Sequence, residues 1–366
     1  MQNTEPGIIP VDPSVTTPPV IPSLTHSSGN AKTLGFKFYG SASEYFGIWI
    51  VNILLTIVTL SLYAPWAKVR RLRYFYGNTE FYNRKFDFTG IPRKILIGRL
   101  IAIGLYIGIS LAAGYSPKIA GIGALLIYLA VPWLLRATIR FTARNSKYGN
   151  SRFYFGGSTL KAYIVFFLAL LLTIVTLGLF FPVAIWLYKR YTFNHLFAGQ
   201  LPFTIHTRWT TFMGAVYLPL LAFIIIVVAL VAVSGISMSS GLEAIGSGAM
   251  AVFGLIYTLA IFFLFPLIAA RVYIATWKNV TLGNSKFDTS CNQWRYAWIE
   301  GTNILARIVS VGFLSPWAAV RSYRYKVDNL TLNMVDDPDQ LYNIAQQDHS
   351  ALAEEISDIF DLDISL

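Results

Sequence analysis

Seven long apolar segments decide which folds are open to this chain. They lie at roughly 45–67, 95–113, 119–135, 161–187, 212–233, 249–270 and 298–320. A helix needs ~20 apolar residues to cross the ~30 Å hydrocarbon core of a bilayer, and several of these segments reach that length. Hydrophobic residues make up 55% of the 366 and charged residues 13%, about half their usual share in a soluble domain. The pattern predicts a polytopic membrane protein and excludes a soluble enzyme.

The two ends of the chain differ from its middle. Residues 1–34 are rich in Pro, Ser and Thr and lack apolar periodicity, which predicts a disordered N-terminal tail. Residues 336–366 hold nine of the 18 acidic residues and follow all 29 lysines and arginines, which predicts an acidic cytoplasmic tail. Within this tail, apolar residues recur at helical spacing, at Leu352, Ile356, Ile359 and Phe360. Two interpretations stay open, a solvated tail and a helix that docks onto a basic cytoplasmic face.

A recurring motif accompanies five of the apolar segments. Each ends in a proline, at Pro65, Pro132, Pro182, Pro266 and Pro316. Thirteen residues later stands an asparagine in four copies, at Asn78, Asn145, Asn279 and Asn329, while the third copy has His195 there with Asn194 beside it. Twenty-one residues after the first four prolines stands a phenylalanine, at Phe86, Phe153, Phe203 and Phe287. The motif predicts a membrane domain (35–335) of five tandem repeat units, at about 36–85, 86–152, 153–202, 203–286 and 287–335.

Each part of the motif has a physical interpretation. Tryptophans directly after the proline suit the headgroup boundary of a membrane, at Trp66, Trp133 and Trp317. The arginines that follow are predicted to face anionic lipid headgroups, at Arg70, Arg73, Arg136, Arg140, Arg144, Arg321 and Arg324. The asparagine is predicted to lie at a turn, because Asn tolerates left-handed backbone geometry. Short alternating stretches predict β-strands that pair into a small sheet against the membrane, at 36–40, 86–90, 153–157 and 203–206.

The distribution of basic residues constrains the topology. If all seven segments crossed, the basic connectors around Lys189–Arg208 and Arg271–Arg295 would be extracytoplasmic, against the positive-inside rule. The favoured alternative folds the three short units (45–67, 161–187 and 298–320) into broken or re-entrant helices. It predicts an all-α polytopic membrane protein with short cytoplasmic β-strands, helical hairpins alternating with these re-entrant helices, and both termini cytoplasmic. Seven plain spans remain the rival interpretation.

The residues of this motif resemble those of a known family. The stretch TLSLYAPWAKVRRLRYFYGNTEFYNRKFDFTG at 59–90, its echoes at 176–205 and 310–331, and the ending at 354–366 are similar to the YjgN-like family of bacterial inner-membrane proteins. The resemblance extends over nearly the whole chain from Gly35 and implies a multi-pass protein of the inner membrane. It implies no function, and no catalytic or ligand residue is carried over. The third copy departs from the family pattern, because Phe181–Pro182–Val183 replaces Pro–Trp.

The chemistry-bearing residues are few. No nucleotide-binding fingerprint, metal-ligand cluster or catalytic constellation stands out, so we expect no enzyme, cofactor, metal or nucleic-acid partner. The lone Cys291 is expected to be structural. Ionisable and amide groups inside apolar segments mark a candidate intramembrane polar site, at Arg307, Glu300, Asn52 and Asn303. For Arg307 and Glu300, a charged pair lining a cavity and a pair of side chains that extend to the membrane interface both stay open.

Two functions from different classes agree with this sequence. Repeated units and broken helices are typical of a transporter or channel-like protein with a site between repeats. A basic cytoplasmic face with an acidic tail is typical of a membrane scaffold that binds anionic lipid or partner proteins. The transporter predicts a continuous polar cavity that contains Arg307 or the asparagines, whereas the scaffold predicts a dry, packed interior. The sequence leaves substrate and oligomeric state open.

Overall fold

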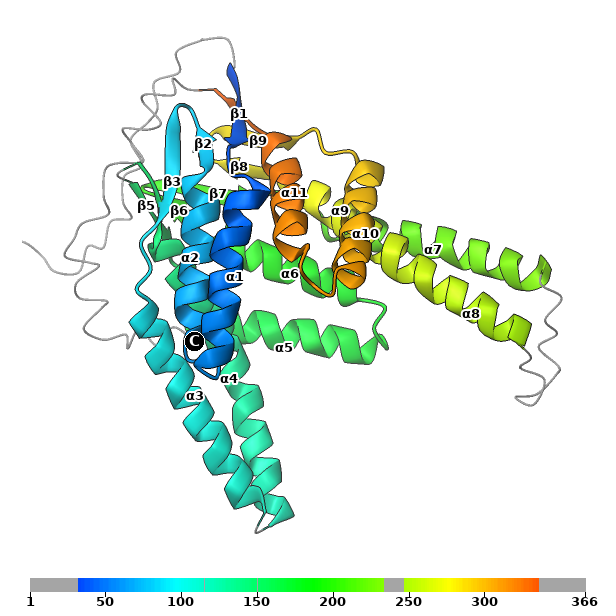
Figure 1. Ribbon diagram of the computed structural model, residues 1–366, viewed down its shortest axis with the longest axis horizontal. Coiled ribbons are helices and arrows are strands. Elements are labelled where there is room, and N and C mark those ends of the chain that lie inside the picture. Colours follow the sequence, from blue (N-terminus) through cyan, green and yellow to red (C-terminus); the bar gives the residue numbers. More distant parts are fainter. Residues whose placement is uncertain (1–31, 115, 150, 234–246, 336–366) are drawn as a thin grey trace, which may run out of the picture.

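Strands from all parts of the chain meet in one closed β-barrel (Figure 1). The computed structural model describes residues 32–114, 116–149, 151–233 and 247–335. Within these ranges the strands are β1 (Lys32–Phe38), β2 (Thr79–Phe81), β3 (Arg84–Phe88), β4 (Ser146–Tyr148), β5 (Ser151–Phe155), β6 (Leu196–Ala198), β7 (Leu201–Ile205), β8 (Val280–Leu282), β9 (Ser285–Thr289) and β10 (Leu330–Met334). All neighbouring strands are antiparallel, and β1 closes the barrel by pairing with both β2 and β10.

Tight turns explain why the short strands form hairpins. The turns after β2, β6 and β8 contain residues with left-handed backbone, with φ values of 45° at Tyr82, 57° at Gly199 and 55° at Gly283. Two-residue turns of this hand match the twist of the flanking strands. Inside the barrel, alternating residues of the strands pack into one apolar cluster that includes Phe81, Phe203 and Leu332. Because the barrel is closed, every strand is paired on both edges, and very short strands need this pairing for stability.

The barrel overturns the all-α fold class predicted from the sequence. The chain is a mixed α/β protein, and its strands form a closed ten-strand barrel rather than a small sheet lying against the membrane. The predicted unit boundaries at Phe86, Phe153, Phe203 and Phe287 each cut a hairpin in two, because β3, β5, β7 and β9 pair with the strand just before them. The barrel draws strands from both ends of the described chain.

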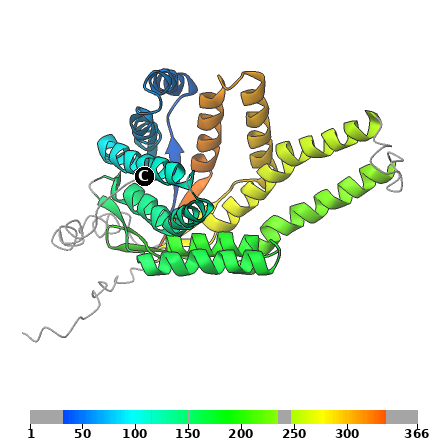
Figure 2. The same ribbon diagram turned by 90° about the horizontal axis from the view of Figure 1, so that it is seen from below.

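The helices form a second ring beneath the barrel (Figures 1 and 2). They are α1 (Ala42–Val58), α2 (Ala64–Gly77), α3 (Pro92–Ala113), α4 (Pro117–Arg144), α5 (Thr159–Val175), α6 (Phe181–Phe193), α7 (Trp209–Val233), α8 (Ser247–Leu259), α9 (Phe265–Trp277), α10 (Gln293–Val309) and α11 (Ser315–Asp328). A π-helical segment, Ala260–Leu264, joins α8 to α9. Each helix packs on the next around the ring, and α11 closes it by packing on α1.

Two long helical hairpins extend furthest from the barrel, in different directions (Figure 1). In the described ranges, four helices are long and apolar enough to cross a membrane: Pro92–Ala113, Lys118–Arg144, Trp209–Ala232 and Val252–Trp277. They coincide with the four segments from which the sequence predicts two crossing hairpins. The remaining pairs, α1/α2, α5/α6 and α10/α11, are shorter hairpins, and both ends of each lie at the barrel. We call them the short hairpins.

The tips of the short hairpins share one hydrogen-bonded turn. At the tip of α1/α2, the Leu60 N–H donates to the Ile57 carbonyl (3.1 Å), the Ser61 N–H to the Thr56 carbonyl (2.7 Å), and the Tyr63 N–H to the Thr59 hydroxyl (3.0 Å). The same bonds recur in the other two tips, with Thr176 and Ser310 in the place of Thr59. A turn whose N–H groups are bonded internally suits an apolar medium, where an unpaired group is costly.

Candidate functional site

Five phenylalanines form a closed ring inside the barrel. Phe36, Phe86, Phe153, Phe203 and Phe287 each lie on a different strand, and neighbouring ring centroids are 6.0 to 6.4 Å apart all the way round. Four of them are the phenylalanines of the sequence motif. The fifth, Phe36, was not assigned to the motif, although its setting Phe–Lys–Phe matches Phe–Asp–Phe at 86–88 and Phe–Tyr–Phe at 153–155.

The planes of this phenylalanine ring lie across the barrel bore. Adjacent ring planes differ by only 13° to 33°. If each ring faced the barrel axis, the planes of neighbouring rings would differ by a fifth of a full turn. The observed differences are much smaller, so the five rings lie roughly perpendicular to the barrel axis. Rings with centroids this close are in edge contact. The opening that they leave on the axis is therefore narrow and wholly apolar.

A cavity of about 730 Å³ runs from the barrel interior to the level of the helices and includes all five phenylalanines in its wall. Helices beneath the barrel contribute further residues to the wall, with Tyr76 of α2, Thr138 of α4, Tyr188 of α6, Tyr273 of α9 and Tyr323 of α11. Because five helices and the barrel all line it, this axial cavity lies on the common axis of both rings. Its wall is mainly aromatic and aliphatic.

One charged group reaches the wall of the axial cavity among the residues described. The Lys326 Nζ lies 3.7 Å from Glu300 Oε1 and 5.1 Å from the centre of the Tyr296 ring, so its charge is compensated. In the barrel, the Tyr148 hydroxyl donates to the Phe81 carbonyl (2.8 Å). Burial raises the pKa of Tyr148 to about 12, which keeps this phenol neutral at physiological pH. The wall at the barrel is thus uncharged.

The asparagines of the motif cap helices and tie them to the barrel. Asn78, Asn145, Asn279 and Asn329 each donate from Nδ2 to the carbonyl four residues earlier, at 2.7 to 3.0 Å. Their own carbonyls accept the N–H of the residue that follows a neighbouring strand. The backbone of Asn145 is right-handed (φ −93°), so tolerance of left-handed geometry is not why asparagine recurs. The carboxamide is used instead to satisfy a helix C-terminus.

His195 takes the place of asparagine in the third copy. Its Nδ1 lies 2.8 Å from the Tyr191 carbonyl, four residues earlier, and its own carbonyl accepts the Gly156 N–H (2.8 Å). We therefore expect His195→Asn to keep wild-type thermal stability, whereas His195→Ala loses the cap and about 1 kcal/mol. Thermal unfolding of the two variants in detergent measures the difference, and equal melting temperatures would contradict this role.

The candidate polar site does not gather around one cavity. Asn303 is fully buried between α10 and α11, where its Nδ2 donates to Ser322 Oγ (2.8 Å) and its Oδ1 accepts from Arg321 Nη1 (3.1 Å). Asn52 is buried on α1, and its Oδ1 accepts no hydrogen bond from the residues described. Both asparagines lie on the short hairpins, away from the wall of the axial cavity.

The two charged residues of that candidate site are also separate. Glu300 pairs with Lys326, whereas Arg307 lies half-buried in the last turn of α10 and forms no ion pair among the described residues. Of the two alternatives left open for these residues, the charged pair between Glu300 and Arg307 is not formed among the described residues. Arg307, Glu300, Asn52 and Asn303 do not line the axial cavity formed by the described residues, so this cavity is not the polar one that the transporter predicts from these residues.

Several arginines predicted to face lipid bind the protein's own carbonyls. Arg73 Nε donates to the Phe88 carbonyl (3.0 Å), Arg136 Nε to the Gly157 carbonyl (2.6 Å) and Arg324 Nη2 to the Gly40 carbonyl (2.7 Å). These carbonyls lie at or just after the end of a strand, where the chain turns into the next helix. Arg140 is buried, Arg144 is half-buried and Arg70 is exposed. Arg73, Arg136 and Arg324 thus hold their helices against the barrel.

The prolines of the motif mark one level of the helical ring. Pro65, Pro182, Pro266 and Pro316 lie in the first turn of α2, α6, α9 and α11, where a missing N–H costs nothing, and Pro132 lies inside α4. All five are buried. Trp66 and Trp133 are half-buried beside them, while Trp317 is exposed.

Comparison with known proteins places this architecture in a family. A family model described as bacterial protein of unknown function (DUF898) matches residues 33–359. The inner membrane protein YjgN of Escherichia coli (strain K12) is 30% identical over 142 residues, which are 38% of this chain and 35% of that protein. The inner membrane protein YjgN of Salmonella typhimurium (strain LT2) is 27% identical over 197 residues, 48% of each chain. The matched stretches span between about a third and a half of these relatives, and no solved structure matches this chain. The chain therefore belongs to this family of bacterial proteins of unknown function and is YjgN-like, similar to proteins of the bacterial inner membrane.

Proposed function

We propose that this membrane protein is a gated, channel-like conduit whose pathway follows the axis of the barrel. The observation that carries the proposal is the axial cavity of about 730 Å³, crossed by the closed ring of Phe36, Phe86, Phe153, Phe203 and Phe287. An apolar constriction of this kind stops water and ions by dewetting, without filling the whole bore. The described conformation then corresponds to a closed state.

The orientation that we propose places the barrel in the cytoplasm. Strands next to every basic connector belong to one barrel, so these connectors lie on one side of any membrane that the protein crosses. Arginine and lysine favour the cytoplasmic side, so the barrel and both termini are assigned there. The pathway would enter at the cytoplasmic mouth of the barrel, pass the phenylalanine ring and continue between the helices. The bilayer around them would include anionic lipid, which basic residues on the cytoplasmic side attract.

The test is to open the phenylalanine ring. Replacing Phe153 and Phe203 with serine removes two adjacent rings whose centroids are 6.3 Å apart. Each substitution removes an apolar side chain whose transfer from water is worth about 1.5 to 3 kcal/mol, so the constriction becomes easier to hydrate. We therefore expect potassium efflux from proteoliposomes to rise at least about tenfold over wild type. The matched control replaces two exposed phenylalanines on outer helix faces, Phe46→Ser and Phe253→Ser, and should leave the efflux unchanged.

A second function is favoured by the chemistry of the cavity wall. A mainly aromatic cavity of this size also suits an apolar molecule such as a lipid chain, which would make the protein a membrane-embedded carrier or binding protein. Unchanged efflux from a folded Phe153→Ser, Phe203→Ser variant would contradict the conduit. A stoichiometric lipid extracted from the purified wild type, and lost from a cavity-filling Ala198→Trp variant, would then support the binding protein.

A further inference from the structure

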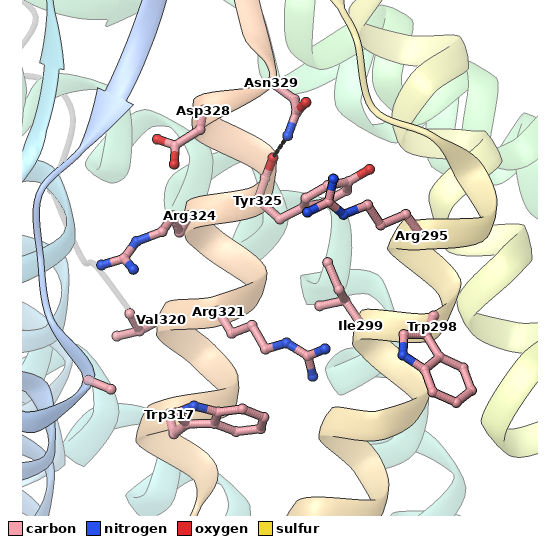
Figure 3. A pocket seen from close by; sticks show the side chains of 11 residues that line it. Arg295, Trp298, Ile299, Trp317, Val320, Arg321, Arg324, Tyr325, Asp328 and Asn329 are labelled. Carbon is pink, nitrogen blue, oxygen red and sulfur yellow. Dashed lines mark hydrogen bonds between the residues drawn. The ribbon is translucent and has the colours of Figure 1, made fainter.

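A groove of about 590 Å³ lies between α10, α11 and the start of α1, outside the axial cavity (Figure 3). Three arginines line it, Arg295 on α10 and Arg321 and Arg324 on α11, against a single carboxylate, Asp328. Two tryptophans, Trp298 and Trp317, form its lower part in the view of Figure 3. The groove thus combines an excess of positive charge with large aromatic surfaces.

The arginines of this groove are unequally engaged. Arg321 donates to Thr302 Oγ1 (2.6 Å), and its guanidinium lies over the Trp317 ring, 5.0 Å from the centroid. Arg324 donates to the Gly40 carbonyl. Arg295 is exposed and lies over the Tyr325 ring at 5.6 Å, and its guanidinium has no hydrogen bond or ion pair with any described residue. Its donors are therefore available to an anion. Arg321 is held in place on the same side of α11, whereas Arg324 extends to the opposite side, where Asp328 also lies (Figure 3).

The carboxylate of the groove does not neutralise Arg295. Asp328 Oδ1 accepts the Phe38 N–H (2.9 Å), which directs this side chain toward β1 rather than toward α10. In Figure 3, Arg295 lies on the α10 side and Asp328 on the far side of α11. The anion-binding donors and the acid are thus on opposite sides of α11.

The corresponding hairpin α1/α2 differs from α10/α11 at residues that line the groove. Asn52 and Asn303 each precede the proline of their hairpin by thirteen residues, so the two hairpins can be aligned position by position. In this alignment Arg321 corresponds to Arg70 and Trp317 to Trp66. However, Glu44 and Gly47 take the places of Arg295 and Trp298. In the α5/α6 hairpin, Lys161 stands at the position of Arg295, but Ile164 and Val183 replace the two tryptophans. Among the three short hairpins, the combination of this positive charge with two tryptophans is thus particular to α10/α11, and common helix packing does not require it.

We propose that this groove binds the phosphate headgroup of an anionic phospholipid, with Arg295 as the main contact and Trp298 and Trp317 packing on the lipid's apolar part. Guanidinium groups pair well with phosphate oxygens, and tryptophan is favoured at the level of the headgroups. Both tryptophans are substantially exposed, Trp298 at 63% and Trp317 at 40%. Exposed indoles beside arginines select a lipid over free phosphate, because a bare ion gains nothing from them.

The test titrates full-length protein in neutral detergent with dioctanoyl phosphatidylglycerol, dioctanoyl phosphatidylcholine or inorganic phosphate, by calorimetry. We expect saturable binding of phosphatidylglycerol alone. Arg295→Gln should weaken it about tenfold, the value of one charged hydrogen bond. The matched control Arg70→Gln makes the same charge change in the α1/α2 hairpin and should have no effect. Trp298→Ala should also weaken phosphatidylglycerol binding.

Three results would overturn the proposal. Equal affinities of the Arg295→Gln and Arg70→Gln variants would show that general charge, not this groove, attracts the lipid. Binding of inorganic phosphate that Trp298→Ala leaves unchanged would assign the groove to a free anion instead of a lipid. Absence of saturable binding would remove the site altogether. Because Arg295 makes no hydrogen bond through its side chain to the described residues, Arg295→Gln should melt like wild type, which checks that the variant is folded.

Discussion

Replacing Leu332 with proline is expected to abolish the folded protein. Leu332 is 2% exposed in β10, opposite Leu34 of β1 on one side and Phe287 of β9 on the other. Proline removes a ladder hydrogen bond and clashes in a strand that is paired on both edges. Together with the lost leucine packing, the cost is about 3 kcal/mol or more, a large part of a typical folding free energy.

The size of this effect follows from the place of β10 in the barrel. β10 joins β9 to β1, and β1 supplies Phe36 to the phenylalanine ring, so opening β10 opens the barrel at the junction of its two ends. The matched control is Val335→Pro, three residues later and exposed, which should stay monodisperse. Size-exclusion chromatography of detergent extracts and thermal unfolding distinguish the two variants. If Leu332→Pro is as stable as Val335→Pro, barrel closure does not hold the fold together.

The motif identifies residues that recur at equivalent places in the structure, because its spacing reflects local structure. The proline, the asparagine and the phenylalanine lie within one helix, its C-terminus and the following hairpin, so a short stretch of sequence contains their geometry. Phe86 and Phe203 hold equivalent positions in the motif, and both belong to the phenylalanine ring inside the barrel. His195 was placed at the asparagine position by spacing alone, and its 2.8 Å contact with the Tyr191 carbonyl gives that placement a physical reason.

Barrel closure was beyond such local patterns. β1 pairs with β10 across some 300 residues, as in the hydrogen bond between Thr33 and Asn333, and no short-range alternation specifies that partner. The first strand also begins at Lys32, within residues assigned to the N-terminal tail. The remaining assigned tail residues, and the acidic tail at 336–366, lie outside the described residues. The sequence predicts strands but not that each of them pairs with two neighbours in a closed barrel, and so the all-α fold class was wrong.

The arginines predicted to face lipid have contacts of a different kind. An arginine can bind a lipid headgroup only if its donors are free, and a sequence does not show the carbonyls exposed at the end of a strand. Arg73 and Arg324 bind such carbonyls, and Arg321 binds Asn303, so these residues stabilise helix packing. Arg295, which was not singled out because it lies in a connector at the start of α10, has the available guanidinium.

Aspartate at the three tips of the short hairpins is expected to remove the protein from the membrane. The apolar side chains at these tips are almost fully exposed: Leu60 at 88%, Leu177 at 95% and Val311 at 87%. Such exposure of apolar surface is unfavourable in water and suits a lipid environment. The helices before them are 17 residues long, which is about 25 Å, short of a full ~30 Å crossing. If the tips end within hydrocarbon, each aspartate costs about 2.5 to 3.5 kcal/mol, and the cost of the triple variant is comparable with the whole folding free energy of a typical protein.

The backbone makes these positions a sharp test. All three residues have left-handed backbone, with φ of 48°, 50° and 49°, which aspartate adopts more easily than leucine or valine. In water the substitution should therefore be neutral or favourable, so any loss reports on the surroundings of the tip. The matched control places aspartate at three exposed apolar residues near the barrel, Tyr39, Ile91 and Leu160. The readout is the amount of monodisperse protein extracted from membranes. Short hairpins that cross completely would place their tips in water on the far side, and the tip variant would then be recovered as well as the control, which would contradict the re-entrant arrangement.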